Sequence, residues 1–375
     1  MSQAEHASPA DRLAALRILD ANFNRASEGL RVVEEHCRLA LGDRHLTERC
    51  KRLRHDLAVA LAGLPTEHLH AARQTQADVG TTVTTPSEQR RQSLEEIVVA
   101  NWRRVEQALR AIEEYAKLVA PDVAQLVERL RYESYTISKA CTTTADSQAR
   151  LAGARLYVLM GGGSSECAFA ERAQELIAAG VEVLQLRDKR LDDRTLLARA
   201  RLLRRIIDEH ANPVRQEPRP PTTHDSRLTT HRPLLVLNDR PDLAVLARAD
   251  GVHLGQEEMT IHDARQIVGP EMLIGVSTHS IEQARQAVQG GASYLGCGPV
   301  FPSGTKQFDQ FPGLPFLRQV AAEIALPAFA IGGITLENLP QVLKAGFTRV
   351  AVNGAIASSS DIFATSDSFR RQLAQ

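Results

Sequence analysis

Eight short runs of aliphatic and β-branched residues recur along the second part of the chain, and helical patterns separate most of them. Strands that alternate with helices pair as a parallel sheet, and eight such units fit a closed barrel better than an open sheet. Residues 154–375 also fall within the size range of (β/α)8 barrels, roughly 200 residues and upward. We therefore expect a C-terminal TIM barrel whose strands begin near Arg155, Val181, Leu234, Gly251, Leu273, Tyr294, Ala328 and Arg349.

Residues 1–139 carry a helical pattern instead. The first apolar stripe has the three- and four-residue spacing of one helix face: Phe23, Ala26, Leu30, Val33 and Cys37. This half is internally duplicated. NFNRASEGLRVVEEH from Asn22 resembles NWRRVEQALRAIEEY from Asn101, and a basic-apolar helical pattern follows each copy, from Lys51 and from Glu128. Two related helical hairpins predict an all-α bundle of about four helices.

Two segments interrupt these patterns. Residues 140–153 are small and polar, which predicts a linker between the halves. The Pro-rich residues 211–233 lack apolar periodicity, and we expect a flexible insertion on the face opposite the active site. His224 and His231 lie in it, but a disordered loop is favoured over a metal site.

Charge and composition argue against several kinds of partner. Lys and Arg total 45 and so do Asp and Glu, so the formal net charge is zero, which disfavours nucleic acid and anionic membranes. No apolar run approaches the roughly 18 residues that cross a bilayer, and no secretory signal is apparent. The five cysteines are scattered without a C-x-x-C pair, so neither zinc nor redox chemistry is indicated. We expect a cytoplasmic protein.

Polar residues gather where the predicted strands end, which is where barrels of this class carry their active sites. Arg187 and Lys189 follow the second strand and suit a polyanion, since both donate charge-assisted hydrogen bonds to phosphate; an exposed salt-bridged turn is the equal alternative. Asp239 follows the third strand, and Glu257 or Glu258 the fourth. Together they offer oxygen ligands for Mg²⁺, although Asp239 alone fits a helix N-cap better.

Further candidates follow the later strands. Ser277 ends the fifth strand and is a better candidate than His279, which could act as an acid or base but fits a helix start better. The loop 298–306 combines glycines, hydroxyls and a lysine and can wrap a phosphate. Gly-rich turns follow the last two strands, at Gly332-Gly333 and Asn353-Gly354, the usual phosphate cradle of such barrels. One end thus suits a metal-bound diphosphate and the other a monophosphate, which predicts a transfer reaction with diphosphate as leaving group.

In chain order, the segments QLRDK, ND, DGVHLGQEE, GVSTHS, GPVFPSGTK, AIGGI and VNGAI resemble those of thiamine-phosphate synthases. The resemblance covers the barrel half. It implies a transferase of thiamine biosynthesis that joins 4-amino-2-methyl-5-(diphosphooxymethyl)pyrimidine to 4-methyl-5-(2-phosphooxyethyl)thiazole and releases diphosphate, with Mg²⁺ as cofactor. Its partners would be these phosphorylated small molecules, and a homo-oligomer stays open. A thiazole tautomerase or a non-catalytic phosphate-binding regulator would not need the complete diphosphate set.

The resemblance also implies roles for individual residues. The pyrimidine diphosphate would contact Gln185, Leu186, Arg187, Asp188, Lys189, Asn238, Ser277 and Lys306. The thiazole phosphate would contact Ser303, Gly304, Thr305, Gly333, Asn353 and Gly354. Asp239 and Glu258 would hold Mg²⁺, with Glu258 where family members often have Asp. The pair Asn353-Gly354 likewise replaces the commoner apolar-Ser form. The catalytic residues would be Arg187, Lys189 and Lys306, which stabilise the charge of the leaving diphosphate.

The helical half resembles a domain that accompanies some of these synthases and is thought to be an alternative hydroxymethylpyrimidine phosphate kinase. A shared cleft would then hold two repeated pairs, Asn22/Asn101 and Arg25/Arg104, and residues 78–82 would form a phosphate loop. The equal alternative is a scaffold or oligomerisation module, in which the repeated Arg and Glu residues form surface ion pairs.

Overall fold

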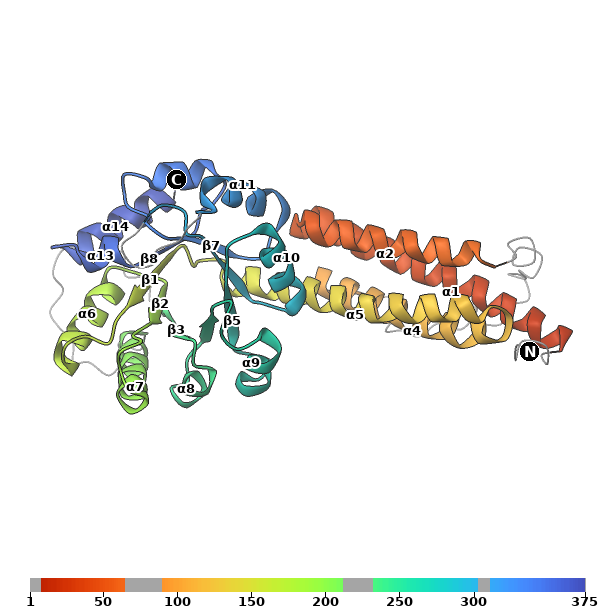
Figure 1. Ribbon diagram of the computed structural model, residues 1–375, viewed down its shortest axis with the longest axis horizontal. Coiled ribbons are helices and arrows are strands. Elements are labelled where there is room, and N and C mark those ends of the chain that lie inside the picture. Colours follow the sequence, from red (N-terminus) through yellow and green to blue (C-terminus); the bar gives the residue numbers. More distant parts are fainter. Residues whose placement is uncertain (1–7, 65–89, 212–231, 303–310, 375) are drawn as a thin grey trace. The chain divides into compact units, whose positions relative to one another are not determined.

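The computed structural model describes residues 8–64, 90–211, 232–302 and 311–374. They divide into two compact units, Met1–Thr142 and Thr143–Gln375, which correspond to the helical and alternating halves of the sequence (Figure 1). Within these described ranges, every helix is too short or too polar to cross a bilayer. The predicted insertion 211–233 lies outside the described residues except at its two ends.

The first unit is a bundle of long helices, as the sequence predicts. Its elements are α1 (Pro9–Glu35), the π-helical turn η2 (His36–Leu41), α2 (Arg44–Ala62), α4 (Leu94–Val119) and α5 (Pro121–Arg150). Side-chain caps begin three of them, because Ser8, Asp43 and Ser93 each accept a hydrogen bond from a backbone N–H in the first turn. The two duplicated helices, α1 and α4, pack against each other.

The internal duplication is repeated in the contacts. The Asn22 amide donates to the Ile18 carbonyl at 2.8 Å, and the Asn101 amide donates to the Ile97 carbonyl at the same distance. The repeated glutamates Glu34 and Glu113 are buried, and each pairs with an arginine of the helix that follows its copy. These pairs are Glu34–Arg54 and Glu113–Arg131. The expected surface ion pairs form between Arg31 and Glu35 and between Arg110 and Glu114, whereas Glu34 and Glu113 are buried.

Helix α5 continues through most of the segment predicted as a linker and ends only at Arg150. The boundary between the two units, after Thr142, falls inside the predicted linker 140–153, but most of that segment is helical because small polar residues interrupt a helix less than Gly or Pro does. Residues 140–150 contain neither Gly nor Pro. Their hydroxyls can also bond to the preceding turn, as Thr142 does when it donates to the Ser138 carbonyl at 3.0 Å.

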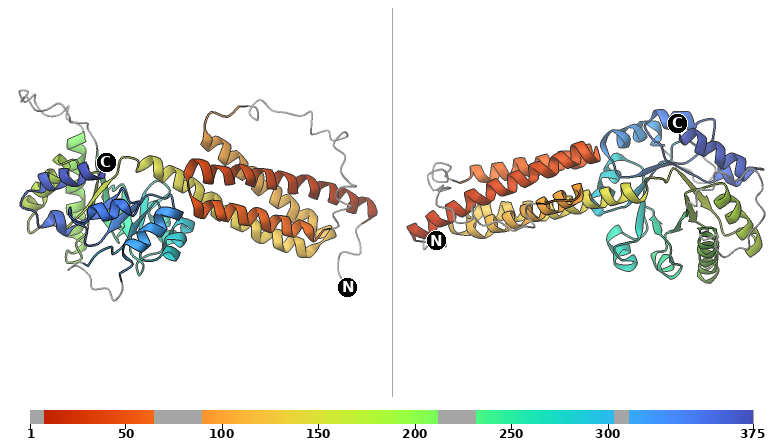
Figure 2. Two further views of the ribbon diagram at one scale, coloured as in Figure 1. Left: turned by 90° about the horizontal axis from the view of Figure 1, so that it is seen from above. Right: turned by 180° about the vertical axis from the view of Figure 1, so that it is seen from behind.

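The second unit is a closed barrel of eight parallel strands in the order β1 to β8, which confirms the predicted (β/α)8 fold. The strands are β1 (Leu156–Met160), β2 (Val183–Leu186), β3 (Leu234–Asn238), β4 (Gly251–Leu254), β5 (Leu273–Thr278), β6 (Tyr294–Cys297), β7 (Ala328–Ile331) and β8 (Val350–Val352). Around them lie α6 (Glu166–Ala178), α7 (Asp193–Ala211), α8 (Pro241–Leu246), α9 (Ile261–Val268), α10 (Ile281–Gly290), α11 (Gly313–Glu323), α12 (Leu339–Lys344), α13 (Gly354–Ala357) and α14 (Ile362–Leu373) (Figure 2).

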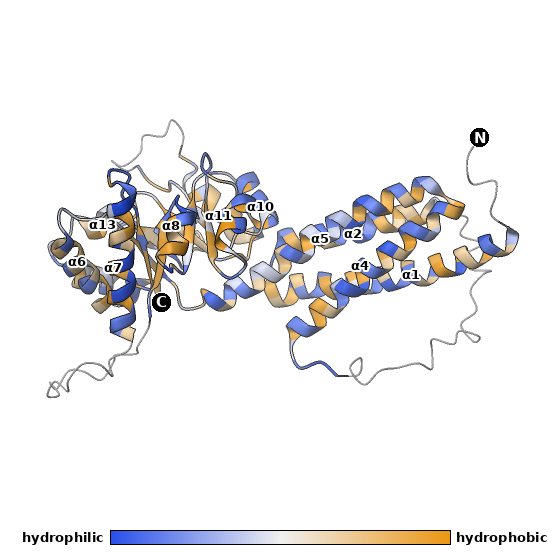
Figure 3. Ribbon diagram, turned by 90° about the horizontal axis from the view of Figure 1, so that it is seen from below, coloured by the Kyte–Doolittle hydropathy of each residue, from blue (hydrophilic) through white to orange (hydrophobic). Residues whose placement is uncertain are grey.

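The hydropathy of the strands reflects their burial inside the barrel. Each strand is nearly all apolar because its two faces are both covered, one by the barrel interior and one by helices. Figure 3 shows the contrast with the helices, which carry polar and apolar faces. Side chains alternate along a strand, so every second residue points inward, and these residues form one core: Tyr157, Val183, Val236, Leu273, Tyr294, Phe329 and Ala351.

Three aromatic rings close the interior of the barrel. Phe329 packs edge-on against Tyr157, with ring centroids 5.2 Å apart, and against Tyr294 at 5.6 Å. Such a pair contributes about 1 kcal/mol beyond the burial of its surface. The same three side chains line the cavity that opens at the carboxyl ends of the strands. A ligand entering from those ends therefore meets an aromatic floor.

Candidate active site

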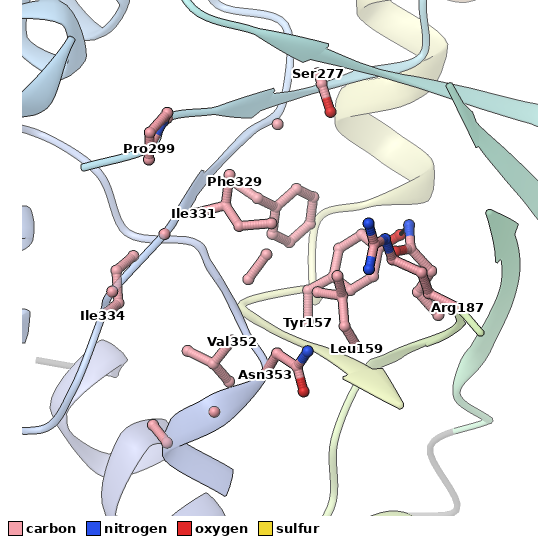
Figure 4. Close-up of a pocket in the computed structure, with 18 of the residues that line it drawn as sticks. Tyr157, Leu159, Arg187, Ser277, Pro299, Phe329, Ile331, Ile334, Val352 and Asn353 are labelled. Atoms are coloured by element: carbon pink, nitrogen blue, oxygen red, sulfur yellow. Dashed lines mark hydrogen bonds between the residues drawn. The ribbon is translucent and has the colours of Figure 1, made fainter. Parts of the chain in front are cut away.

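A cavity of about 480 Å³ lies at the carboxyl ends of the strands (Figure 4). Its walls are largely apolar, with Leu159, Ile331, Ile334 and Val352 among them, while the side chains of Arg187 and Asn353 bring polar groups to it. The lining includes these residues that the sequence predicted: Gln185, Arg187, Asn238, Ser277, Gly333, Asn353 and Gly354. Residues from five different strand ends thus meet at one cavity.

A hydrogen-bonded chain of side chains crosses the cavity floor. The Gln185 amide donates to the Tyr157 hydroxyl at 2.8 Å, and the Tyr157 and Tyr294 hydroxyls lie 3.0 Å apart. His253 continues the chain, with Nδ1 3.3 Å from the Tyr294 hydroxyl and Nε2 3.0 Å from Ser277 Oγ. Among the residues that the structure describes, the buried Gln185 Oε1 has no hydrogen-bond partner. It offers an acceptor to a ligand in the cavity.

Burial keeps this floor uncharged. It lowers the pKa of His253 to about 4, with Asp239 opposing the shift and Arg187 adding to it. Burial also raises the pKa of Tyr157 and of Tyr294. At neutral pH the imidazole therefore has one N–H donor and one acceptor nitrogen. The floor suits a neutral ring with donors and acceptors, and the charged parts of a ligand belong nearer the rim.

The sequence interpretation missed Tyr157, His253, Tyr294 and Phe329 as lining residues. Both tyrosines fit the core of a strand as well as a site, and nothing in the apolar runs separates the two roles. His253 carried a usable signal. It lies between apolar residues at an inward position of β4, where a polar side chain needs a hydrogen-bond partner inside the barrel.

One lysine joins two carboxylates that follow β3 and β4, and none of these three predicted residues is among those that line the cavity. Lys189 Nζ lies 3.1 Å from Asp239 Oδ2 and 3.5 Å from Glu258 Oε1. The hydrogen bond with Asp239 raises the pKa of Lys189. The carboxylates follow β3 and β4, as predicted, and both lie within reach of a single cation. The N-cap of α8 is Arg240, so Asp239 does not have the alternative role of capping this helix.

Asp239 has a backbone conformation that few side chains adopt. Its φ is 61°, in the left-handed region, where Asp is tolerated better than most residues. Its N–H donates to the His253 carbonyl at 2.8 Å, and the Asn238 amide donates to its carboxylate at 2.6 Å. Such strained residues persist where neighbours hold them and are common at functional sites.

The turns after β7 and β8 form the opposite side of the cavity. Gly332 and Gly333 have φ values of 100° and 64°, and a Cβ on Gly333 would lie 2.6 Å from the Pro302 carbonyl oxygen. Asn353 precedes the short helix α13, and a Cβ on Gly354 would meet no atom within 4 Å. A turn after the seventh strand and a short extra helix after the eighth form the usual phosphate site of TIM barrels.

Other predicted residues have different surroundings. Leu186 is buried and alternates with the inward-facing Gln185, so its side chain faces the helices instead of the cavity. The Asp188 carboxylate accepts hydrogen bonds from the Gly162 and Arg190 N–H groups, so it holds loops together. His279, for which a helix start was favoured over a role as an acid or base, lines the cavity. Four predicted residues lie outside the described ranges: Ser303, Gly304, Thr305 and Lys306.

In the helical unit, the residues predicted for a kinase site are not seen to form a common cleft in the part of the chain that the structure describes. Arg25 and Arg104 are exposed, while the Asn22 and Asn101 amides donate to carbonyls of their own helices. The predicted phosphate loop, residues 78–82, lies outside the described residues.

Comparison with known proteins assigns families to both units. Residues 226–356 match the thiamine monophosphate synthase family, and residues 17–140 match the ThiD2 family. The chain is similar to a solved structure of thiamine phosphate pyrophosphorylase from Pyrococcus furiosus. The two are 30% identical, the match covers 59% of this chain and 96% of that one, and the TM-score is 0.48.

Curated relatives match almost the whole chain. A thiamine-phosphate synthase from Rhodopirellula baltica is 45% identical, and the match covers 97% of this chain and 94% of the relative. A thiamine-phosphate synthase from Thermosynechococcus vestitus is 39% identical, with 96% and 95% covered. Since proteins with both units are this similar from end to end, the chain belongs to the thiamine-phosphate synthase family.

Proposed function

We propose that the barrel joins 4-amino-2-methyl-5-(diphosphooxymethyl)pyrimidine to 4-methyl-5-(2-phosphooxyethyl)thiazole by a Mg²⁺-assisted, dissociative loss of diphosphate. As a member of its family, the enzyme is a transferase of thiamine biosynthesis. What is proposed for this chain is the mechanism of the transfer and the residues that carry it out. The observation that carries it is the meeting of Asp239 and Glu258 at the Lys189 ammonium, next in sequence to Asn238, which lines the cavity with the neutral floor.

The two carboxylates fit a divalent ion. Mg²⁺ takes one or two carboxylates and completes its shell with water and substrate phosphates, and Asp239 and Glu258 both reach one cationic position. When bound there, Mg²⁺ would neutralise charge on the diphosphate as a Lewis acid. Arg187 and Lys189 would donate charge-assisted hydrogen bonds to the departing oxygens. Lys306 is proposed for the same task.

The bond changes need no protein nucleophile. The C–O bond to diphosphate breaks, and its electron pair leaves with the diphosphate. The aminopyrimidine carries the resulting benzylic-type cation until the thiazole nitrogen donates its lone pair and forms the new C–N bond. Gln185 Oε1 supports this proposal, because it can accept a hydrogen bond from the amino group of the ring. The apolar walls, which include Leu159 and Ile331, exclude water that would otherwise capture the cation.

The thiazole phosphate is proposed to bind across the cavity, at Gly333, Asn353 and Gly354. Backbone N–H groups in Gly-rich turns bind phosphate without a side-chain charge. The open space beside Gly354 supports this location. A phosphate there and a diphosphate near Arg187 would leave the two rings to meet over the aromatic floor.

An assay on the full chain tests the proposal. With both substrates and Mg²⁺, the enzyme is expected to release one diphosphate for each thiamine phosphate formed. Asp239→Asn should lower kcat by at least about 100-fold, because it weakens the ion that supports the leaving group. Asp242→Asn is the matched control, since Asp242 pairs with Arg240 on α8 and should leave kcat near normal. Full activity after chelation of all divalent ions would contradict the proposal.

The helical unit is proposed to phosphorylate hydroxymethylpyrimidine phosphate, the activity that its resemblance implies. Its match to the ThiD2 family over residues 17–140 supports a unit with a function of its own. The test supplies the full chain with ATP, Mg²⁺, hydroxymethylpyrimidine phosphate and the thiazole phosphate, but no pyrimidine diphosphate. Thiamine phosphate should form only when ATP is present. No product, in a sample that is active with the diphosphate, would favour a scaffold instead.

A further inference from the structure

Three cysteines from distant parts of the sequence meet inside the helical unit. Cys37 lies in η2, Cys50 in α2 and Cys141 in α5, and each side chain is almost completely buried. The Cys37 and Cys141 sulfurs are 3.3 Å apart, the Cys37 and Cys50 sulfurs are 3.9 Å apart, and all three lie within 4.8 Å of one another. Neither reaction proposed above uses them. We name this group the cysteine cluster.

The internal duplication shows that packing alone does not require these cysteines. The two copies are offset by 79 positions in their first helices and by 77 positions in their second helices, because α2 begins at Arg44 and α5 at Pro121. At these offsets the counterparts of Cys37, Cys50 and Cys141 are Ala116, Val127 and Leu64. All three counterparts are buried. Ordinary apolar side chains therefore fill the three positions that the duplication makes equivalent to the cysteines.

The backbone departs from the duplication at the same place. Cys37 lies in the π-helical turn His36–Leu41, whereas its counterpart Ala116 lies in regular α-helix that continues to Val119. A π-helical turn widens the helix and changes the direction of its side chains, and such turns are frequent at functional sites. The first copy thus contributes two of the sulfurs and the altered backbone, Cys141 of the second copy contributes the third sulfur, and the three equivalent positions carry no sulfur.

The distances suit a small ion among the sulfurs. A metal–sulfur bond of about 2.3 Å places three sulfurs about 4 Å apart around a central ion in one plane. Each Cys–Cys distance in the cluster is close enough to reach that value with small side-chain movements.

We propose that Cys37, Cys50 and Cys141 bind one thiophilic d¹⁰ metal ion through three sulfurs, and that Cu⁺ is preferred to Zn²⁺. Soft sulfur ligands favour both ions. Structural zinc, however, almost always has four protein ligands. Over the part of the chain that the structure describes, no His, Asp or Glu joins the three cysteines in a possible metal site. A set of three sulfurs therefore suits Cu⁺, which accepts fewer ligands than Zn²⁺.

The test uses the full-length protein, fully reduced and without oxygen. Cu⁺ is titrated in competition with a coloured Cu⁺ chelator, and wild type is expected to take up one equivalent ahead of the chelator. Zn²⁺ is titrated in the same way against a zinc indicator. The dissociation constant of the protein for Zn²⁺ should be at least tenfold larger than its dissociation constant for Cu⁺. X-ray absorption of the Cu⁺ sample should show sulfur ligands only. Wild type that takes no Cu⁺ from the chelator, or that binds copper through nitrogen or oxygen, would overturn the proposal.

The duplication supplies variants that should fold. Cys37→Ala, Cys50→Val and Cys141→Leu each introduce the residue found at the equivalent position of the other copy. Each should reduce Cu⁺ affinity at least 100-fold while the helical circular dichroism stays normal. Cys167→Ser is the matched control, because Cys167 is exposed on α6 and should not affect binding. Undiminished binding in the three folded variants would contradict the assignment, even if wild type binds one ion.

Discussion

At the residue scale, Lys189 is the side chain whose surroundings say most about the proposed chemistry. Its ammonium forms ion pairs with both Asp239 and Glu258, the two carboxylates proposed to hold Mg²⁺. An ammonium and a divalent ion cannot share such a small space without strong repulsion. We therefore infer that Lys189 turns toward the diphosphate when the ion binds, so that one side chain serves the free and the substrate-bound enzyme in different ways.

This inference predicts opposite effects on turnover and on Mg²⁺ affinity. Lys189→Met should lower kcat by about 100-fold, since a donor to the leaving group is lost. The same variant should need less Mg²⁺ for half-maximal activity, because the competing ammonium is gone. Arg190→Met is the control, since Arg190 pairs with Asp188 and not with the two ligands. Mg²⁺ activation curves measure both effects, and a higher Mg²⁺ requirement in Lys189→Met would contradict the idea.

His253 predicts a pH dependence of barrel stability. Its pKa is about 4 in the folded barrel and 6.5 when the side chain is unperturbed. Between these values the unfolded chain binds more protons, so the stabilisation is complete above pH 6.5 and is lost as the pH falls toward 4. The full loss amounts to about 3 kcal/mol.

Histidine-labelled NMR gives the direct measurement for His253. The chain has twelve histidines, so the signal is assigned by its disappearance in His253→Asn. The imidazole should stay neutral down to about pH 5, well below the range in which exposed histidines titrate. A titration midpoint near 6.5 would show that the ring is not held in the buried network with Tyr294 and Ser277.

At the element scale, the turns after β7 and β8 separate glycines needed for folding from one needed for binding. A Cβ on Gly333 would meet the Phe301 and Pro302 carbonyl oxygens, whereas a Cβ on Gly354 would enter open space. The sequence predicted both as phosphate-cradle residues because each sits in a Gly-rich turn. It could not distinguish them, since the difference depends on the neighbouring β6 loop, which packs against one turn and not the other.

This difference predicts separable effects of two alanine substitutions. Gly354→Ala should leave thermal unfolding unchanged and raise KM for the thiazole phosphate by about tenfold or more, because the methyl group enters the proposed phosphate site. Gly333→Ala should destabilise the barrel by roughly 1–3 kcal/mol, owing to the left-handed backbone and the clash. Calorimetry and steady-state kinetics distinguish the two. An unchanged KM in Gly354→Ala would place the phosphate elsewhere.

The limits of sequence interpretation are also clearest for whole elements. The barrel could be predicted because buried parallel strands leave a strong, repeated apolar signal. The end of α5 could not, because small polar residues fit a linker and a helix equally well until hydroxyl–carbonyl bonds such as Thr142 to Ser138 are seen. The aromatic floor was missed for a similar reason: Tyr157 and Tyr294 have the same pattern whether they fill a core or line a cavity.

At the scale of the whole molecule, the chain joins a unit of packed long helices to a closed barrel of eight strands. The cysteine cluster illustrates what sequence spacing cannot show. Its members are far apart in the sequence, so they were interpreted as scattered residues, and only the fold brings the sulfurs together. The duplication was visible in the sequence, but the burial of Glu34 and Glu113 was not.

Those buried glutamates predict that the two units lose stability separately. Removing one partner of a buried ion pair costs about 3 kcal/mol or more, because the other charge stays in the core. Glu113→Gln should therefore destabilise the helical unit strongly, since Arg131 is nearly buried. Glu34→Gln should have a smaller effect, because the Arg54 side chain is 33% exposed and reaches water.

Trp102 makes this prediction measurable, because it is the one tryptophan of the chain and is buried in α4. Its fluorescence during urea unfolding reports the helical unit, while thiamine phosphate formation reports the barrel. Each unit has a core of its own, so Glu113→Gln should lower the fluorescence midpoint and leave synthase activity in the absence of urea unchanged. Arg103→Gln, on the exposed side of α4, is the control and should shift neither. A parallel loss of fluorescence midpoint and activity in Glu113→Gln would mean that the barrel depends on the helical unit for its fold.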